Sequence, residues 1–130
     1  ERRVTIEMRL VEQCFAMADA ERLRPAMSII LENAIIYTPA GGTVTVTLEK
    51  AGNKARLGVA DTGIGIDKRD LPRMFTKFFR SDEAKKTDTE GLGIGLYIAK
   101  EVIRRHGGRI SVSSEGLGKG ALFTVELPAA

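Results

Sequence analysis

The stretch "EGLGIGLYIAKEVIRRHGG" (residues 90–108) decides how the chain is organised, because it joins a glycine cluster directly to a run with helical periodicity. The apolar spacing predicts a helix over residues 94–106, ended by two further glycines. Three glycines stand at alternating positions where this helix must start: Gly91, Gly93 and Gly95. Glycines at a helix start suit either an anion, which exposed backbone N–H groups bind, or a tight turn. From these residues alone, both interpretations stay open.

Two familiar phosphate motifs are absent from the chain. The P-loop pattern fails because "GKG" at residues 118–120 is followed by Ala121 rather than by serine or threonine. The dinucleotide fingerprint fails because "GLGIGL" has the wrong spacing, and because the polar segment 81–90 precedes it instead of a strand. Any phosphate site here must be of another kind.

The bulk composition is that of one ordinary globular domain. The chain has 130 residues, of which 43% are hydrophobic and 28% charged, and its net charge is +3 without a block of like charges. We therefore expect a solvated charged surface and no nucleic-acid partner. Cys14 is the single cysteine, so no internal disulfide forms, and no apolar run is long enough to span a bilayer. The chain starts at "ERRVTIEM", and we expect it to be a piece of a longer protein.

Alternation and periodicity predict an α+β fold. An amphipathic helix, capped by Asp19 and tolerating Pro25 in its first turns, precedes the stop signal "TPAGG". Period-2 alternation predicts strands over residues 4–10, 43–50, 54–61, 109–115 and 121–128, with a further short strand at 12–18. Residues 81–90 read as a mobile loop. Hairpin-linked strands with helices gathered elsewhere predict helices on one face of a mixed sheet.

Two polar side chains stand out beside the glycines. Asp61 follows an apolar strand and precedes Gly63 and Gly65, so it is placed to accept a hydrogen bond from an exocyclic amine of a flat ligand. The alternative is a turn in which Asp61 caps its own backbone. Asn33 is the one amide within the apolar face of the first helix, and it suits either a satisfied core position or an oxygen ligand for Mg²⁺.

In this order and spacing, the segments resemble the catalytic ATP-binding domain of sensor histidine kinases, within the gyrase, chaperone, kinase and mismatch-repair ATPase superfamily. The segments that carry the resemblance are "LENAIIYTP" (31–39), "DTGIGI" (61–66), "MFTKFFRSD" (74–82), "GLGIGLYIAKEVIRRHGG" (91–108) and "GLGKGALFTVELP" (116–128). The resemblance covers essentially residues 1–130 as a single catalytic ATP-binding domain. It implies a two-layer α/β sandwich (the Bergerat fold), with a flexible lid formed by residues 81–90.

The resemblance also implies a role for each matching residue. Asn33 would ligate the Mg²⁺ that bridges the phosphates and would be the catalytic residue, while Asp61 would accept the adenine amino group. The expected ATP-binding residues are Asn33, Tyr37, Asp61, Gly63, Gly65, Lys77, Arg80, Gly91, Leu92, Gly93, Gly95 and Leu96. Phe75, Phe78 and Phe79 would anchor the lid, although aromatic residues at this spacing are also typical of a core. For Lys77 and Arg80 the alternative is a solvated surface charge.

Two positions depart from the family pattern. Ile29 stands where the family usually has an asparagine, one helical turn before Asn33, and Ile36 stands where it usually has a lysine or arginine. Neither isoleucine can hydrogen-bond a cation's water or neutralise a phosphate. The loss of a charge-assisted contact typically forfeits about 1.5–3 kcal/mol, so we expect weaker binding of Mg²⁺ or nucleotide unless Lys77 and Arg80 compensate.

The function implied by the resemblance is binding of Mg-ATP and delivery of its γ-phosphate to a histidine on a separate dimerisation domain of the same kinase, with a response regulator downstream. The single histidine, His106, ends the second long helix and is expected to be structural. We expect a cytoplasmic, monomeric fragment that is inactive without the acceptor histidine. Two alternatives stay open: a regulatory nucleotide-binding domain without phosphoryl transfer, and an ATP hydrolase, which would need a general-base glutamate where Ile29 stands.

Overall fold

The structure, a computed structural model, describes residues 4–10, 20–80 and 94–128. Its elements, in chain order, are β1 (Thr5–Leu10), α1 (Ala20–Ile36), β2 (Thr43–Ala51), β3 (Lys54–Asp61), the 3₁₀ turn η1 (Leu71–Arg73), α3 (Gly95–Arg105), β4 (Arg109–Ser113) and β5 (Ala121–Pro128). These bounds agree within two residues with the strands and the second helix predicted from the sequence. The expected strand at 12–18, the cap Asp19 and the loop 81–90 lie outside the described residues.

The strands form one mixed sheet in the order β1-β2-β3-β5-β4. β1 pairs with β2 in parallel, while β2, β3, β5 and β4 are joined by antiparallel ladders. The parallel pair is separated in the chain by α1, as a parallel connection requires, and the hairpin β2–β3 needs only a short turn. The mixed sheet predicted from the sequence is confirmed.

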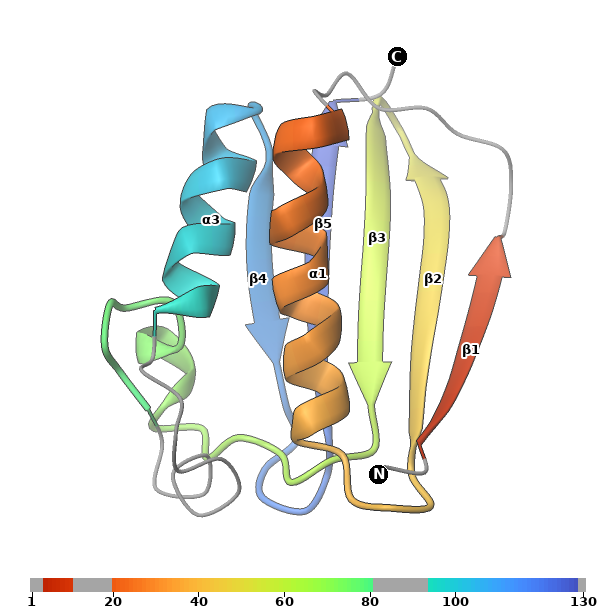
Figure 1. Cartoon of the computed structure of the whole chain (residues 1–130), viewed down its shortest axis with the longest axis vertical. Coiled ribbons are helices and arrows are strands. Elements are labelled where there is room, and N and C mark those ends of the chain that lie inside the picture. Colours follow the sequence, from red (N-terminus) through yellow and green to blue (C-terminus); the bar gives the residue numbers. More distant parts are fainter. Residues whose placement is uncertain (1–3, 11–19, 81–93, 129–130) are drawn as a thin grey trace.

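Both helices cover the same face of this sheet, which gives the predicted two layers (Figure 1). α1 packs along α3, and both lie on the inward-facing residues of the strands. Along β5, every second side chain is buried, namely Phe123, Val125 and Leu127. The core lies between the layers, and it is completed on the helix side by Ala26, Ile30, Ala34, Ala99 and Ile103.

The first helix follows the predicted periodicity. Ala26, Ile30 and Ala34 are fully buried at steps of four residues, so one stripe of α1 faces the core. Pro25 lies in the second turn, where its missing N–H removes one bond near the helix start. At the other end, the buried Thr38 hydroxyl donates to the carbonyl oxygen of Ala34 at 2.6 Å, which satisfies a terminal carbonyl of the helix.

The opposite face of the sheet is polar and carries a row of alternating charges. Arg56 and Glu126 are cross-strand partners, and Arg56 Nη2 lies 2.7 Å from Glu126 Oε2. Glu49 pairs with Arg56 on one side, and Arg109 with Glu126 on the other. These side chains belong to the solvated charged surface expected from the composition.

Candidate functional site

Of the residues singled out in the sequence, Asn33, Tyr37, Asp61, Gly63 and Gly65 lie at or just beyond the ends of α1 and β3. The carboxyl ends of α1, β3 and β4 point to the same end of the molecule, where the chain turns into β5 (Figure 1). Backbone hydrogen bonds join the segment after β3 to the end of α1 and to the β4–β5 turn. Ile64 N–H donates to Tyr37 O at 3.0 Å, and Gly118 N–H donates to Ile64 O at 2.8 Å. Gly120 N–H also donates to Gly63 O at 3.2 Å. Backbone hydrogen bonds therefore hold this loop on two sides.

Asp61 is the last residue of β3 and shares the helix-facing side of the sheet with the buried Val59. Burial raises the pKa of its carboxyl group, and hydrogen bonds from the backbone amides of Gly63 and Ala121 act in the opposite direction. The Gly63 N–H donates to Asp61 Oδ1 at 2.8 Å. The turn-capping interpretation is therefore confirmed for this residue, while recognition of a ligand amine stays a prediction.

Gly63 and Gly65 are glycines because the loop runs against its neighbours. A Cβ at Gly63 would collide with the carbonyl oxygen of Tyr37 and would lie 2.8 Å from Asp61 Oδ1. Gly65 has φ +73°, and a Cβ there would collide with the carbonyl oxygen of Gly116. Their structural role is close approach of backbone to backbone, whether or not a ligand is present.

Asn33 lies one helical turn before Tyr37, near the carboxyl end of α1, and both residues are half-buried. The Tyr37 N–H donates to Asn33 O at 3.2 Å, so the backbone fixes their relative position. Among the described residues, the Asn33 side chain has no hydrogen-bond partner, which leaves its amide oxygen available. A single amide oxygen fits Mg²⁺, because this ion commonly takes one or two protein ligands together with phosphate oxygens and water.

The aromatic segment after η1 divides into core and surface. Phe75 packs edge-to-face on the buried Phe123, with ring centroids 6.1 Å apart, so the core alternative is correct for Phe75. It is wrong for Phe78, which is 64% exposed and adopts a left-handed backbone with φ +68°. The guanidinium of Arg73 lies 4.5 Å from the ring centroid of the half-buried Phe79.

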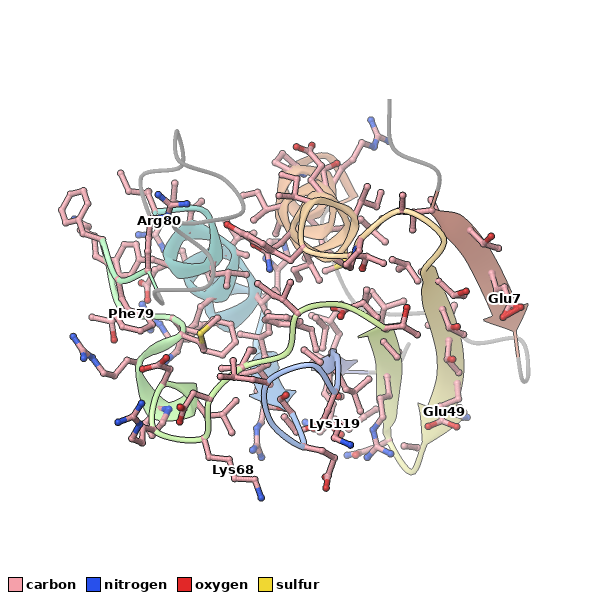
Figure 2. The ribbon with its side chains drawn as sticks, turned by 90° about the horizontal axis from the view of Figure 1, so that it is seen from below. Glu7, Glu49, Lys68, Phe79, Arg80 and Lys119 are labelled. Carbon is pink, nitrogen blue, oxygen red and sulfur yellow. The ribbon has the colours of Figure 1, made fainter. Side chains whose placement is uncertain are left out.

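The two expected phosphate-binding cations lie on this same side of the molecule. The Lys77 ammonium is 5.1 Å from the ring centroid of Tyr97, which places it beside the first turn of α3. Figure 2 shows Arg80 on the α3 side of the molecule, far from Glu7 and Glu49 on the outer strands. Lys77 is exposed and Arg80 half-buried. The alternative prediction, a solvated surface charge, therefore describes Lys77 only in part, because its ammonium group also lies over the Tyr97 ring.

The start of α3 explains one departure from the family pattern. Gly95 is the first residue of the helix, and a Cβ there would lie 3.2 Å from Ile29 Cγ2. Ile29 is half-buried and packs against the core cluster. The isoleucine therefore holds α1 against the first turn of α3, and Leu96 joins the same packing. Gly91, Leu92 and Gly93 lie outside the described residues.

Sequence reasoning missed Ser114, whose hydroxyl joins the loop after β3 to the turn between β4 and β5. It accepts a hydrogen bond from Ile66 N–H at 3.1 Å and donates to Gly120 O at 2.6 Å. The only signal in the sequence is its place just before "EGLGKG", which does not distinguish it from Ser113. His106, by contrast, is structural as expected: its Nδ1 bonds Val102 O at 2.7 Å just after the last turn of α3.

The family follows from the comparison of this chain with known proteins. Residues 18–130 match the family described as histidine kinase-, DNA gyrase B- and HSP90-like ATPases. The chain belongs to this family. Among its relatives, the sensor-like histidine kinase SenX3 of Mycobacterium tuberculosis is 40% identical over 113 residues, which are 87% of this chain and 27% of SenX3. The chain thus spans about a quarter of the length of that relative.

Solved structures of histidine kinases share the fold. The mycobacterial sensor histidine kinase MprB has a TM-score of 0.87 and 30% identity over 97% of this chain and 84% of its own. Full-length ShkA, solved in complex with AMPPNP, has a TM-score of 0.81 and 32% identity over 98% of this chain and 26% of its own. The chain is therefore an ATP-binding domain of the histidine kinase type, and nothing in these comparisons favours the regulatory alternative.

Two further properties bear on the site. Across residues 4–10, 20–80 and 94–128, no helix has the length and apolar character needed to cross a membrane. In the same ranges, no three histidine, cysteine, aspartate or glutamate side chains cluster as a metal centre would require.

Proposed function

We propose that this domain binds Mg-ATP at the end of the molecule where α1 and β3 finish, and that it supplies the γ-phosphate to a histidine on a separate dimerisation domain. The observation that carries the proposal is the loop after β3. It is fixed between Tyr37 O and the β4–β5 turn, and it presents the partly buried Asp61 carboxylate beside two glycines. Such a carboxylate is placed to accept the exocyclic amine of adenine.

The remaining roles follow from position along the same surface. Tyr37 packs beside the base, and Asn33 contributes an oxygen to Mg²⁺, which when bound neutralises phosphate charge. We assign the phosphates to Lys77 and Arg80 and to the start of α3 at Gly95 and Leu96. Residues 91–93, which lie outside the described residues, keep the phosphate role that the resemblance implies. α1 carries no basic residue in its last turn, where Ile36 stands. Lys77 and Arg80 therefore supply the positive charge that a lysine or arginine at position 36 supplies in the family.

The chemistry asks for positioning and charge neutralisation rather than for a covalent group from this chain. An imidazole nitrogen of the acceptor attacks the γ-phosphorus, the bond to the bridging oxygen breaks, and ADP leaves. Water activation has no candidate base one turn before Asn33, because Ile29 occupies that position and packs on α3. This supports transfer to a histidine over hydrolysis, with a response regulator as the next acceptor in the cytoplasm.

The test is calorimetric titration of the domain with a non-hydrolysable ATP analogue, with and without Mg²⁺. We expect binding that strengthens with Mg²⁺, and we expect Asn33→Ala to remove that Mg²⁺-dependent gain. Glu32→Gln is the matched control, since Glu32 is the exposed neighbour of Asn33 on the same turn. No binding at millimolar nucleotide would overturn the proposal and favour a regulatory domain that has lost its ligand.

A further inference from the structure

The hydroxyl group of Ser114 uses all of its hydrogen-bonding capacity inside the protein. Its oxygen accepts from Ile66 N–H at 3.1 Å and from Gly116 N–H at 3.2 Å. Its own proton goes to Gly120 O at 2.6 Å, and the carbonyl oxygen of Gly116 lies further away at 3.3 Å. A hydroxyl group has one proton and two lone pairs, so nothing is left to offer a ligand.

The partners of this hydroxyl belong to the two segments that frame Asp61. Ile66 is buried and ends the loop after β3. Gly120 precedes Ala121, the cross-strand partner of Asp61, and its N–H donates to Gly63 O at 3.2 Å. One side chain therefore connects the loop, five residues after Asp61, to the turn, one residue before the cross-strand partner of Asp61.

Without Ser114, backbone hydrogen bonds would hold only the first part of the loop after β3. Gly118 N–H to Ile64 O and Gly120 N–H to Gly63 O join the same two segments, but both lie before Ile66. The Ser114 hydroxyl adds the anchor at the far end of the loop, where the chain leaves toward η1. Without it, two amides and one carbonyl oxygen would lose their partner in a partly buried place.

We infer that Ser114 is a positioning residue for base recognition: it fixes the loop after β3 against the β4–β5 turn, and thereby sets the direction in which Asp61 faces an adenine amine. This inference rests on the proposed function. Ser114 acts through Asp61 and Gly63 and does not touch the nucleotide. A residue that only stabilised the fold would change the stability of the domain without changing its choice between bases.

The choice between adenine and guanine is the measurement that separates these cases. Adenine offers an exocyclic amine where guanine offers a carbonyl oxygen, which a carboxylate repels. The domain is titrated with non-hydrolysable analogues of ATP and GTP in the wild type, Ser114→Ala, Ser114→Cys and Ser113→Ala. Ser113 is the exposed neighbour on the outer face of the sheet and serves as the matched control. Ser114→Cys keeps the shape but hydrogen-bonds weakly, so it covers the case in which Ser114→Ala does not fold.

We expect both Ser114 variants to lose about tenfold in preference for the ATP analogue, as is usual for one lost hydrogen bond, while Ser113→Ala keeps the wild-type ratio. Amide exchange at Ile66 should quicken in the same two variants. An unchanged ratio in Ser114→Cys would overturn the inference while leaving the proposed function intact. A wild type that binds neither analogue, or binds both equally, would instead remove the proposed function on which the inference rests.

Discussion

At the scale of single residues, Asp61 shows a conflict between stability and recognition. Its carboxyl group is partly desolvated, and burial raises its pKa although two backbone amides favour the charged form. A charge kept in such a place is a stability cost that a ligand's donor can offset. On the proposed function, the residue whose charge is costly in the free domain is the one that recognises the base.

We predict that Asp61→Asn makes the domain more stable at neutral pH and weakens its binding of adenosine by about 10- to 100-fold, the usual loss for a charge-assisted hydrogen bond. The asparagine oxygen can still accept from Gly63 N–H, so the turn survives. Thermal unfolding and calorimetry measure the two effects. A variant that binds adenosine like the wild type would show that Asp61 does not contact the base.

The same residue sets a pH dependence whose sign follows from its raised pKa. The folded state holds the Asp61 proton more tightly than the unfolded state does, so the free energy of unfolding falls as pH rises from the ordinary aspartate value of 3.8 through the raised folded value. We predict that the stability difference between Asp61→Asn and the wild type grows across this window and is flat above it. Denaturant unfolding at a series of pH values measures the difference, and a difference that shrinks with rising pH would contradict the assignment.

Some of the site could be predicted from residue types, and some could not. The position of Asp61 could be predicted, because an acid directly after an apolar strand and before two glycines marks the end of a strand; its role toward a base stays a prediction. Ser114 was not predicted, because its partners are backbone groups, and the one that lies far away in the sequence, Ile66 N–H, reaches it only in the folded sheet. A hydrogen bond to a backbone group cannot be predicted from residue types, because nearly every residue carries the same N–H and C=O groups.

At the scale of elements, the contact between α1 and α3 gives Ile29 a role that family pattern alone could not show. Read as a missing asparagine, Ile29 predicted weaker Mg²⁺ binding. In the structure its Cγ2 methyl lies 3.2 Å from the place of a Cβ at Gly95, so the two helices meet there as closely as a glycine allows. The identity of residue 95 is thus linked to the branched side chain at residue 29.

We predict that Gly95→Ala gains no stability in the wild type, although alanine is favoured over glycine in helices by about 1 kcal/mol. In an Ile29→Leu background, which lacks the Cγ2 branch, the same change should be stabilising. An Ile29→Val background keeps that branch and is the matched control. Denaturant unfolding of the six proteins gives the coupling energy, expected at about 0.5–2 kcal/mol. Equal effects of Gly95→Ala in the leucine and valine backgrounds would contradict this contact.

In the aromatic segment after η1, the spacing of the phenylalanines does not predict which of them are buried. Phe75, Phe78 and Phe79 look equivalent in the sequence, but only Phe75 reaches Phe123 in the core. Phe78 is exposed, and its backbone adopts the left-handed region at φ +68°, a conformation that a β-carbon disfavours. A single dihedral of this kind depends on the packing of neighbouring turns and is not predictable from composition.

We predict opposite results for two substitutions in this segment. Phe75→Ala should lower the free energy of unfolding by about 3 kcal/mol, because it leaves a space beside Phe123. Phe78→Asn should leave stability unchanged or raised, since asparagine tolerates the left-handed region better and little buried area is lost. Chemical denaturation measures both, and a large loss in Phe78→Asn would show that its ring is part of the core.

At the scale of the whole molecule, the layered fold was predictable because the two periodicities are clear. Strand alternation and a helical stripe each require an apolar partner, and one sheet covered by two helices satisfies both. The strand order was not predictable, because it depends on which edges pair at long range. Parallel pairing of β1 with β2 places the chain so that α1 ends beside the end of β3. That arrangement brings Asn33 and Tyr37 to the loop after Asp61.

The same architecture decides whether His106 could accept phosphate within this chain. It follows the carboxyl end of α3, whereas Asp61 ends β3, and these two ends lie at opposite ends of the molecule (Figure 1). Its Nδ1 is also held by the carbonyl oxygen of Val102, and since a carbonyl oxygen only accepts, that nitrogen carries the proton. Nδ1 therefore cannot attack phosphorus, and Nε2, which keeps its lone pair, belongs to a residue at the end of the molecule opposite to Asp61.

We therefore predict that the domain incubated with γ-labelled ATP and Mg²⁺ carries no acid-labile label, and that His106→Gln changes nothing in this assay. An added dimerisation segment bearing the acceptor histidine should take up the label, because under the proposed function the γ-phosphate is transferred to a histidine on a separate domain. The Asp61→Asn variant should label that segment more slowly, in proportion to its weaker nucleotide binding. Label found on His106 itself would contradict the geometry, since it would require the two ends of the domain to meet.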